Sequence, residues 1–295
     1  MSRRGWFLFL AMSVIWGCPY LLIRIAVREI EPGTLIFLRT APAALLLAPL
    51  ALRRGALSGI LPRWRWLVAF TAAELAVPWF FVGRAEIHLT SSVTGLLIAS
   101  VPLVGAVIYR LFGYDRFDRR RILGLLVGFG GVAALVGVDL HGADLGPTVE
   151  VLIPAVGYAL GPLIISRKLD DLPGIGVITV SLAIASVVYS PYALTHLPSS
   201  VSLEVVASVA GLAVVCTALA FVLFFDLIVE VGPARSTVIT YLNPAVAVLL
   251  GVLVLGEPFT WGIALGFPLI LLGSWLATAP PPEGASPLAA EPAAA

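Results

Sequence analysis

Apolar positions along this chain gather into ten long runs, separated by short connections that contain most of the charged residues. A membrane-spanning helix needs about 20 predominantly apolar residues, and each run approaches or exceeds that length. The first five predicted spans are Gly5–Val27, Thr34–Leu52, Trp66–Val82, Thr90–Phe112 and Arg121–Val138. The second five are Val149–Ile165, Ile175–Leu194, Val205–Ile228, Ala234–Leu255 and Thr260–Thr278. The pattern predicts an all-α integral membrane protein.

The pattern also repeats itself. Shifting the sequence by 142 positions places Leu89–Gly137 on Val231–Ala279. Residues that coincide include Pro102 with Pro244, Phe117 with Phe259, Gly124 with Gly266 and Gly131 with Gly273. We therefore expect a first five-helix repeat over residues 5–138, a second over 149–278, and a disordered Pro/Ala-rich tail over 279–295. Duplicated sets of spans are typical of secondary transporters, whose halves move about a site between them.

Composition agrees with this class: 60% of the 295 residues are hydrophobic and 12% are charged. An ordinary soluble domain has about 25% charged residues. The net charge of +1 offers no broad basic face for nucleic acid, so nucleic acid is excluded as a partner. The N-terminal run resembles a secretory signal, but it is long enough to span, and we interpret it as a retained first helix.

Basic residues predict the orientation, because Lys and Arg concentrate in cytoplasmic loops. Placing the N-terminus in the cytoplasm assigns fourteen of the eighteen basic residues to the inside, Arg28 and Arg84 to the outside, and Arg24 and Arg39 to helices. An odd number of spans per repeat inverts the second copy, so equivalent loops face opposite sides. Accordingly, the loop from Tyr114 to Arg121 is rich in arginine, whereas the equivalent segment of the second repeat, Gly256–Ile263, has no arginine. We expect both termini in the cytoplasm and a multi-pass protein of the cytoplasmic (inner) membrane.

Several motifs make the chain similar to the EamA repeats of the drug/metabolite transporter superfamily. They are Ile15-Trp16-Gly17, Tyr241-Leu242-Asn243-Pro244-Ala245, Leu255-Gly256-Glu257-Pro258 and the closing segment Gly266–Leu276. The resemblance covers about Trp6 to Ala277. One departure is Tyr114-Asp115, where the family has a Gly-Glu pair. The resemblance implies transport of small metabolites, often export, through a cavity lined by the first, third, fourth, sixth, eighth and ninth helices.

Glu74 is the leading candidate for chemistry, because it is the only formal charge in its span and lies near the middle. An unpaired charge at that depth costs on the order of 2.5 to 3.5 kcal/mol, so such residues usually face a cavity or a partner. Glu74 is a candidate proton carrier or counter-ion, or alternatively a packing carboxyl. Arg39, near the outer start of its helix, either binds an anionic group or snorkels to the headgroups. Arg24 is the same kind of shallow cation.

Prolines predict helix breaks at corresponding places in both halves: Pro19 pairs with Pro162, and Pro102 with Pro244. Interrupted helices in both halves point to a transporter's central site. Polar and aromatic residues near these breaks are candidate substrate contacts: Trp16, Tyr20, Tyr158, Tyr241 and Asn243. The alternative for the aromatic residues is anchoring at the membrane interface.

Gly124–Gly128 and Gly262–Gly266 have the spacing that permits close helix approach, which predicts either internal packing or a homodimer seam. Cys18 and Cys216 lie in apolar runs, and we predict neither a disulfide nor a metal site. The sequence has no phosphate-binding loop and no nucleophile elbow, so no cofactor is expected.

These features predict a secondary transporter that moves amino acid-like metabolites or drugs by alternating access, with proton coupling through Glu74. Membrane lipid and the small substrate are the expected partners. An uncoupled facilitator of the same fold is the main alternative. A membrane-embedded enzyme is a weaker one, because His88, His141 and His196 lie in or beside outer loops without metal-like spacing.

Overall fold

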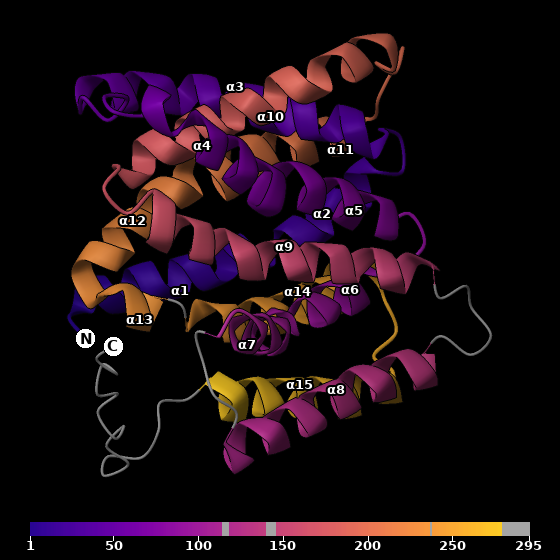
Figure 1. The fold of residues 1–295 in the computed structure, drawn as a ribbon. Helices are drawn as coiled ribbons and strands as arrows, with labels where there is room; N and C mark the ends of the chain where they lie inside the picture. The colour runs from indigo at the N-terminus through magenta and orange to yellow at the C-terminus, as the bar shows by residue number, and fades with distance from the viewer. Residues whose placement is uncertain (114–117, 140–145, 237, 279–295) are drawn as a thin grey trace, which may run out of the picture.

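The computed structural model describes residues 1–113, 118–139, 146–236 and 238–278, and all regular elements within these ranges are helical (Figure 1). The first half contains α1 (Arg3–Gly17), α2 (Pro19–Ala26), α3 (Pro32–Arg53), η1 (Leu61–Arg63), α4 (Trp64–Thr71), η2 (Ala72–Ala76), α5 (Val77–Ala85), α6 (Ser91–Ile98), α7 (Val101–Leu111) and α8 (Arg119–Asp139). The second half contains α9 (Gly146–Lys168), α10 (Gly174–Thr195), α11 (Leu203–Ala210), η3 (Gly211–Leu219), α12 (Ala220–Val231), α13 (Pro233–Ser236), α14 (Ile239–Leu255) and α15 (Trp261–Thr278). The predicted tail and Tyr114-Asp115 lie outside the described residues.

Nine segments of the described chain are long and apolar enough to cross a membrane, and a tenth apolar helix, Ile239–Leu255, is slightly shorter. Four of the long segments combine consecutive helical elements: α1 with α2, η1 to α5, α6 with α7, and α11 to α12. All ten predicted spans are therefore present, and the predicted class of a ten-helix membrane protein is confirmed.

Helix pairing follows the duplication. Helix α3 packs on its counterpart α10 at one edge of the molecule, and α8 packs on its counterpart α15 at the opposite edge (Figure 1). Between these edges, α5 packs on α9, and the equivalent helices α12 and α1 also pack together. Likewise, the contact between α7 and α9 is equivalent to the contact between α14 and α1. The two repeats are thus interleaved about a pseudo-twofold axis, the arrangement of inverted-repeat transporters.

The proline breaks appear in the first half only. Cys18 separates α1 from α2 directly before Pro19, and Ala99 and Ser100 separate α6 from α7 directly before the turn that contains Pro102. In the second half, α9 continues through Pro162 and α14 through Pro244. The structure here differs from the prediction of paired breaks. A proline removes one backbone hydrogen bond, and a membrane helix tolerates that loss when neighbouring groups compensate for it.

A different irregularity is shared by both halves. Segments η2 and η3 are π-helical, and each lies in the middle of a long span. Shifted by 142 positions, Ala72–Ala76 falls on residues 214–218, which lie inside η3. Most π-helical turns are single insertions in α-helices and occur frequently at functional sites. The duplication has therefore conserved a widened turn at the same depth in both halves.

Glycines allow the close approach of α8 and α15. A β-carbon on Gly131 would lie 2.8 Å from the Ile270 nitrogen and 2.9 Å from the Gly266 oxygen, and one on Gly273 would overlap the Gly128 backbone. The glycine-rich faces thus serve packing within one chain. The homodimer stays a prediction.

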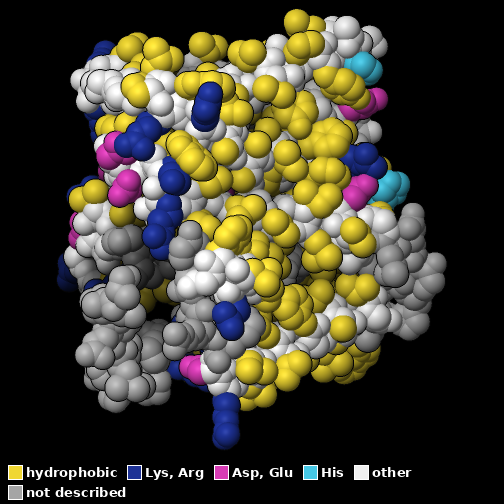
Figure 2. Space-filling view, in the orientation of Figure 1, with side chains coloured by type: hydrophobic (Ala, Val, Ile, Leu, Met, Phe, Trp, Pro, Cys, Tyr) yellow, Lys and Arg dark blue, Asp and Glu magenta, His cyan; other side chains and the backbone are white. Residues whose placement is uncertain are grey.

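The surface agrees with a membrane location. Figure 2 shows hydrophobic side chains over much of the visible face, with most of the Lys and Arg side chains toward the left end and His side chains at the right end. We call the end that carries Arg53, Arg54, Arg63, Arg65 and Lys168 the basic end. The opposite end carries the connections 27–31, 86–90, 196–202 and 256–260, and we call it the closed end because polar contacts join its loops.

Candidate functional site

A cavity of about 590 Å³ lies between the two repeats, large enough for a small organic molecule. Helices of both halves contribute to its wall. The lining residues are Trp16, Pro19, Tyr20, Ile23, Arg39, Phe70, Glu74, Leu75, Trp79, Val82, Ile98, Ala99, Val101, Pro102, Tyr158, Pro162, Ile165, Leu169, Leu172, Gly174, Val177, Ile178, Cys216, Phe221, Phe224, Phe225, Ile228, Ser236, Ile239, Thr240, Asn243 and Pro244. Among these described residues, Arg39 and Glu74 are the ionisable Arg and Glu side chains, so the cavity wall has one basic and one acidic group.

Glu74 lies in η2 and lines the cavity. Its Oε2 atom is buried and has no hydrogen-bond partner in the described part of the chain. The carboxyl packs directly against Gly161 of α9, where a β-carbon would overlap Oε2. Gly161 therefore makes room for the acid, a role that the sequence pattern did not indicate.

Arg39 is 6% exposed and lies two turns inside α3, so it does not snorkel to the headgroups. Its Nε donates a 2.8 Å hydrogen bond to Thr217 Oγ1 of η3. The guanidinium carbon lies 3.5 Å from the centre of the Trp79 ring, a cation–π contact. No carboxylate of the described residues lies within ion-pair distance of Arg39. A buried, uncompensated guanidinium that lines a cavity is suited to bind an anion.

Aromatic side chains form another part of the wall. Trp16 of α1 packs on Phe224, with 4.6 Å between ring centres, and on Phe221, with 5.8 Å. Phe225 continues this cluster on α12 and touches Gly174, at the start of α10 and at the basic end. This aromatic wall (Trp16, Phe221, Phe224 and Phe225) offers a large apolar surface to a ligand.

The remaining predicted contacts divide into two groups. Tyr20, Tyr158 and Asn243 line the cavity. With its amide oriented to suit its neighbours, Asn243 donates to the carbonyl oxygens of Ser13, at 3.2 Å, and Ile239, at 2.9 Å, and so ties α14 to α1. Tyr241 is not among the lining residues, and its hydroxyl is 2.8 Å from Thr278 Oγ1 on α15. Of the predicted set, the structure places Tyr241 apart from the others.

Arg24 is also apart from the cavity. It donates a hydrogen bond to the backbone oxygen of Glu86. This contact joins α2 to the residue that follows α5.

Polar contacts join the loops at the closed end. Tyr192 donates to Glu31, and the Ser202 backbone N–H donates to Glu29 at 2.7 Å, which lowers the pKa of the Glu29 carboxyl. An ion pair of 2.8 Å connects Arg84 to Glu150. These contacts link the first repeat to the second above the cavity, and none of the loop residues at this end lines it.

The Leu255-Gly256-Glu257-Pro258 motif organises the same end. Gly256 ends α14 with φ +66°, and the Glu257 N–H bonds back to the Gly251 oxygen at 3.0 Å. This left-handed glycine cap is a frequent helix terminus. The Glu257 carboxylate then accepts hydrogen bonds from the backbone N–H groups of Ser91 and Ser92 at 2.8 and 3.0 Å, and so caps α6. One motif thus ends one helix and starts another in the other repeat.

At the basic end, by contrast, the cavity wall includes Leu169 and Leu172, from the connection between α9 and α10, and Gly174, the first residue of α10. Side chains from the α12–α14 region, such as Ile228, complete this rim. The cavity therefore reaches the basic end and stops short of the closed end.

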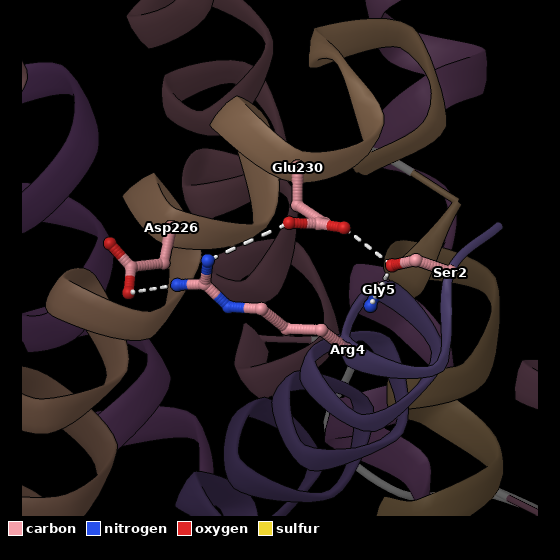
Figure 3. Close-up of polar contacts among 5 residues, drawn as sticks. All are labelled: Ser2, Arg4, Gly5, Asp226 and Glu230. Atoms are coloured by element: carbon pink, nitrogen blue, oxygen red, sulfur yellow. Dashed lines mark hydrogen bonds and ion pairs between the residues drawn. The ribbon is translucent and has the colours of Figure 1, made fainter.

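A cluster at the basic end holds α1 against α12 (Figure 3). Arg4 lies between the carboxylates of Asp226, at 3.2 Å, and Glu230, at 3.7 Å. Ser2 donates to Glu230 and also accepts from the Gly5 N–H at 2.9 Å, which caps α1. Exposed ion pairs contribute little stability individually, but this cluster fixes the position of the first helix relative to the second repeat.

Comparisons with known proteins agree with this architecture. The profile of the EamA-like transporter family matches residues 3–137 and 149–279. An uncharacterized inner membrane transporter of Escherichia coli (strain K12), YedA, is 32% identical over 92% of each chain. A probable amino-acid metabolite efflux pump of Salmonella typhimurium is 23% identical and covers 94% of this chain and 95% of its own. A probable terminal-alkyne amino-acid exporter of Streptantibioticus cattleyicolor is 25% identical over 87% of each chain. A solved crystal structure shares the fold, with a TM-score of 0.66 at 20% identity over 94% of this chain and 97% of its own.

Proposed function

The chain belongs to the EamA-like transporter family, and from this premise we propose that it exports amino acid-like metabolites from the cytoplasm by alternating access. As a member of this family, it is a multi-pass inner-membrane transporter of small molecules. The relatives named as an amino-acid metabolite efflux pump and an amino-acid exporter support the proposed direction and substrate class.

The observation that carries the proposal is a cavity that reaches one end of the molecule while contacts join the loops at the other. In our assignment the basic end is cytoplasmic, because Lys and Arg concentrate on that side of inner-membrane proteins. Both termini are then cytoplasmic as well. The cavity in this structure would receive its substrate from the cytoplasm. Export follows when the halves rock to open the other end.

The acidic and basic side chains of the cavity support a zwitterionic substrate. Arg39 binds the carboxylate, and Glu74 compensates the ammonium group. The aromatic wall then contacts the apolar side chain. A cationic drug would use Glu74 and the aromatic wall but would leave Arg39 uncompensated, so the arginine favours the amino acid.

Glu74 is also our proposed proton-coupling group. Its carboxyl lines the cavity, and its buried Oε2 atom has no hydrogen-bond partner among the described residues, so it is suited to change its protonation when the substrate's ammonium group arrives or leaves. An uncoupled facilitator is the alternative, and the closed end disfavours a continuous pore of that kind.

The test uses purified protein in liposomes with an internal pH dye. The panel contains amino acids, other metabolites and lipophilic cations, each presented as a gradient, and radiolabelled substrate is followed in parallel. We expect a pH change that depends on an amino acid and that is lost in Glu74→Gln. Exposed Glu204→Gln is the matched control, since it removes a carboxylate outside the cavity.

Three other results would contradict parts of the proposal. Substrate movement without any pH change would contradict proton coupling and establish a facilitator or uniporter. Transport and proton flux unchanged in Glu74→Gln would remove Glu74 from the mechanism. A response to lipophilic cations alone would replace the amino acid as substrate class.

A further inference from the structure

Thr217 lies behind the cavity wall, where it contacts the lining residue Arg39. Hydropathy does not single it out, because hydroxyl residues are common in membrane helices. It is fully buried in η3, on the second repeat. Its Oγ1 donates to the Leu212 oxygen, five residues earlier, at 2.8 Å. Because the hydroxyl hydrogen is used there, the oxygen is left to accept the Nε–H of Arg39, which it does at 2.8 Å. Two bonds therefore fix the direction of this hydroxyl group.

The consequence for Arg39 is geometric. A guanidinium has five N–H donors in its plane, and two of its edges can each bind a carboxylate through two parallel bonds. One of these edges includes Nε, and Thr217 occupies it. The end formed by the two Nη groups has no hydrogen bond to the described protein. Arg39 can therefore receive a carboxylate end-on, with a single orientation.

Trp79 restricts the remaining freedom of the guanidinium. Its ring centre lies 3.5 Å from the guanidinium carbon, so the ring covers one face of the planar group. Trp79 comes from α5, Arg39 from α3 and Thr217 from η3, so three separate elements converge on one cation. A side chain held in this way loses little conformational freedom when it binds a ligand, which favours affinity.

We propose that Thr217 and Trp79 are positioning residues that make Arg39 the determinant of carboxylate specificity in the central cavity. This inference rests on the proposed function of that cavity. It adds the residues that separate an amino acid from the corresponding amine or amide.

The experiment measures binding and counterflow for L-phenylalanine and L-methionine, each compared with its carboxamide, which lacks the negative charge. Thr217→Val keeps the shape but removes the hydroxyl, and Thr217→Ser keeps the hydroxyl. We expect Thr217→Val to raise the KM for the amino acids at least about tenfold, as expected for a lost hydrogen bond to a charged group, with a smaller change in the maximal rate. The carboxamides should bind all variants alike, and Thr217→Ser should remain close to the unmodified protein.

Three outcomes overturn the inference. An equal loss in Thr217→Val and Thr217→Ser would assign the effect to packing rather than to the hydroxyl. Equal losses for amino acids and carboxamides would indicate a general change of the cavity. Unchanged KM values in Thr217→Val would show that Arg39 needs no positioning by this residue.

Arg39→Gln separates this inference from the proposed function. If the unmodified protein binds neither amino acid, the proposed substrate class fails, and the inference fails with it. If Arg39→Gln loses the preference for carboxylates while Thr217→Val retains it, the proposed function stands and only the positioning role is overturned. Size-exclusion profiles of the purified variants confirm that each remains folded.

Discussion

Glu86 is a fully buried carboxyl at the closed end, directly after α5, and neither of its side-chain oxygens has a partner among the described residues. Burial raises the pKa of Glu86 well above its ordinary value, while Arg24 acts in the opposite direction and Glu257 in the same. The folded protein thus keeps Glu86 protonated at pH values where an exposed carboxyl is ionised. Stability must fall as the pH rises from the ordinary value toward the raised one, by at most about 1.4 kcal/mol per pH unit.

We therefore predict that Glu86→Gln, which cannot ionise, raises the melting temperature at pH 8 and leaves it nearly unchanged near pH 4.5. Melting curves of the detergent-solubilised protein across this pH range measure the effect. Glu204→Gln is the control, because Glu204 is exposed and forms a surface ion pair with Arg28 at the same end. A melting temperature lowered equally at every pH would contradict the prediction and assign Glu86 a purely structural role.

Two kinds of cavity residue are predictable from the sequence: charged residues whose chemistry conflicts with the membrane, and polar or aromatic residues near the prolines, such as Tyr20 and Asn243. Glu74 and Arg39 attract notice because a charge in an apolar span needs an explanation. Thr217, Trp79 and Gly161 carry no such conflict, and their roles arise from contacts between segments distant in sequence. Tyr241 lies near Pro244 in sequence, but proximity in sequence does not determine which face of a helix a side chain occupies.

The paired helices α8 and α15 show how strongly one element depends on another. Gly130 and Gly131 are adjacent on α8, yet a β-carbon on Gly130 has nothing within 4 Å, whereas one on Gly131 meets the α15 backbone. Alanine has a higher helix propensity than glycine by about 1 kcal/mol, so the two substitutions share this gain. Only Gly131→Ala must also force two backbones apart.

Gly131→Ala should therefore lower the melting temperature, through a net cost of about 1–3 kcal/mol, while Gly130→Ala should leave it unchanged or slightly higher. Thermal unfolding of the two purified variants, measured side by side, tests this difference. Equal melting temperatures would mean that α15 can move away from α8 at no cost. The close packing seen between these helices would then not contribute to stability.

At the scale of helices, hydropathy located all ten spans because every span must supply a long apolar surface to the lipid. Helix breaks are harder to predict than spans. A proline shows where one hydrogen bond is missing, but whether the helix stops there depends on its neighbours, and α9 and α14 continue through Pro162 and Pro244. The π-helical segments η2 and η3 have no distinctive composition. These two segments are equivalent in conformation and in their position within the repeat.

The whole molecule combines a cavity that reaches the basic end with loops joined at the other end, and this combination makes the state of the transporter testable. Leu172 lies on the cavity rim at the basic end, whereas Ile87 is 44% exposed at the closed end. Val82 lines the cavity beneath the closed end and is 3% exposed. Single cysteines at these three positions, after replacement of Cys18 and Cys216 by Ala, report access from each side of the membrane.

In the orientation that we propose, a membrane-impermeant thiol reagent should modify Ile87→Cys in spheroplasts and Leu172→Cys only in inside-out vesicles. Val82→Cys should resist the reagent in spheroplasts, because Gly83 packs on Pro32 and the Glu29 and Glu31 contacts join the loops above it. If Ile87→Cys instead reacts only in inside-out vesicles and Leu172→Cys reacts in spheroplasts, the orientation of the protein is the reverse of the one that we propose. Rapid modification of Val82→Cys in spheroplasts would show that the closed end is open in the membrane, so the resting transporter would face outward. If an amino acid on the cytoplasmic side makes Val82→Cys reactive from the outside, the two halves alternate access as the duplicated architecture requires.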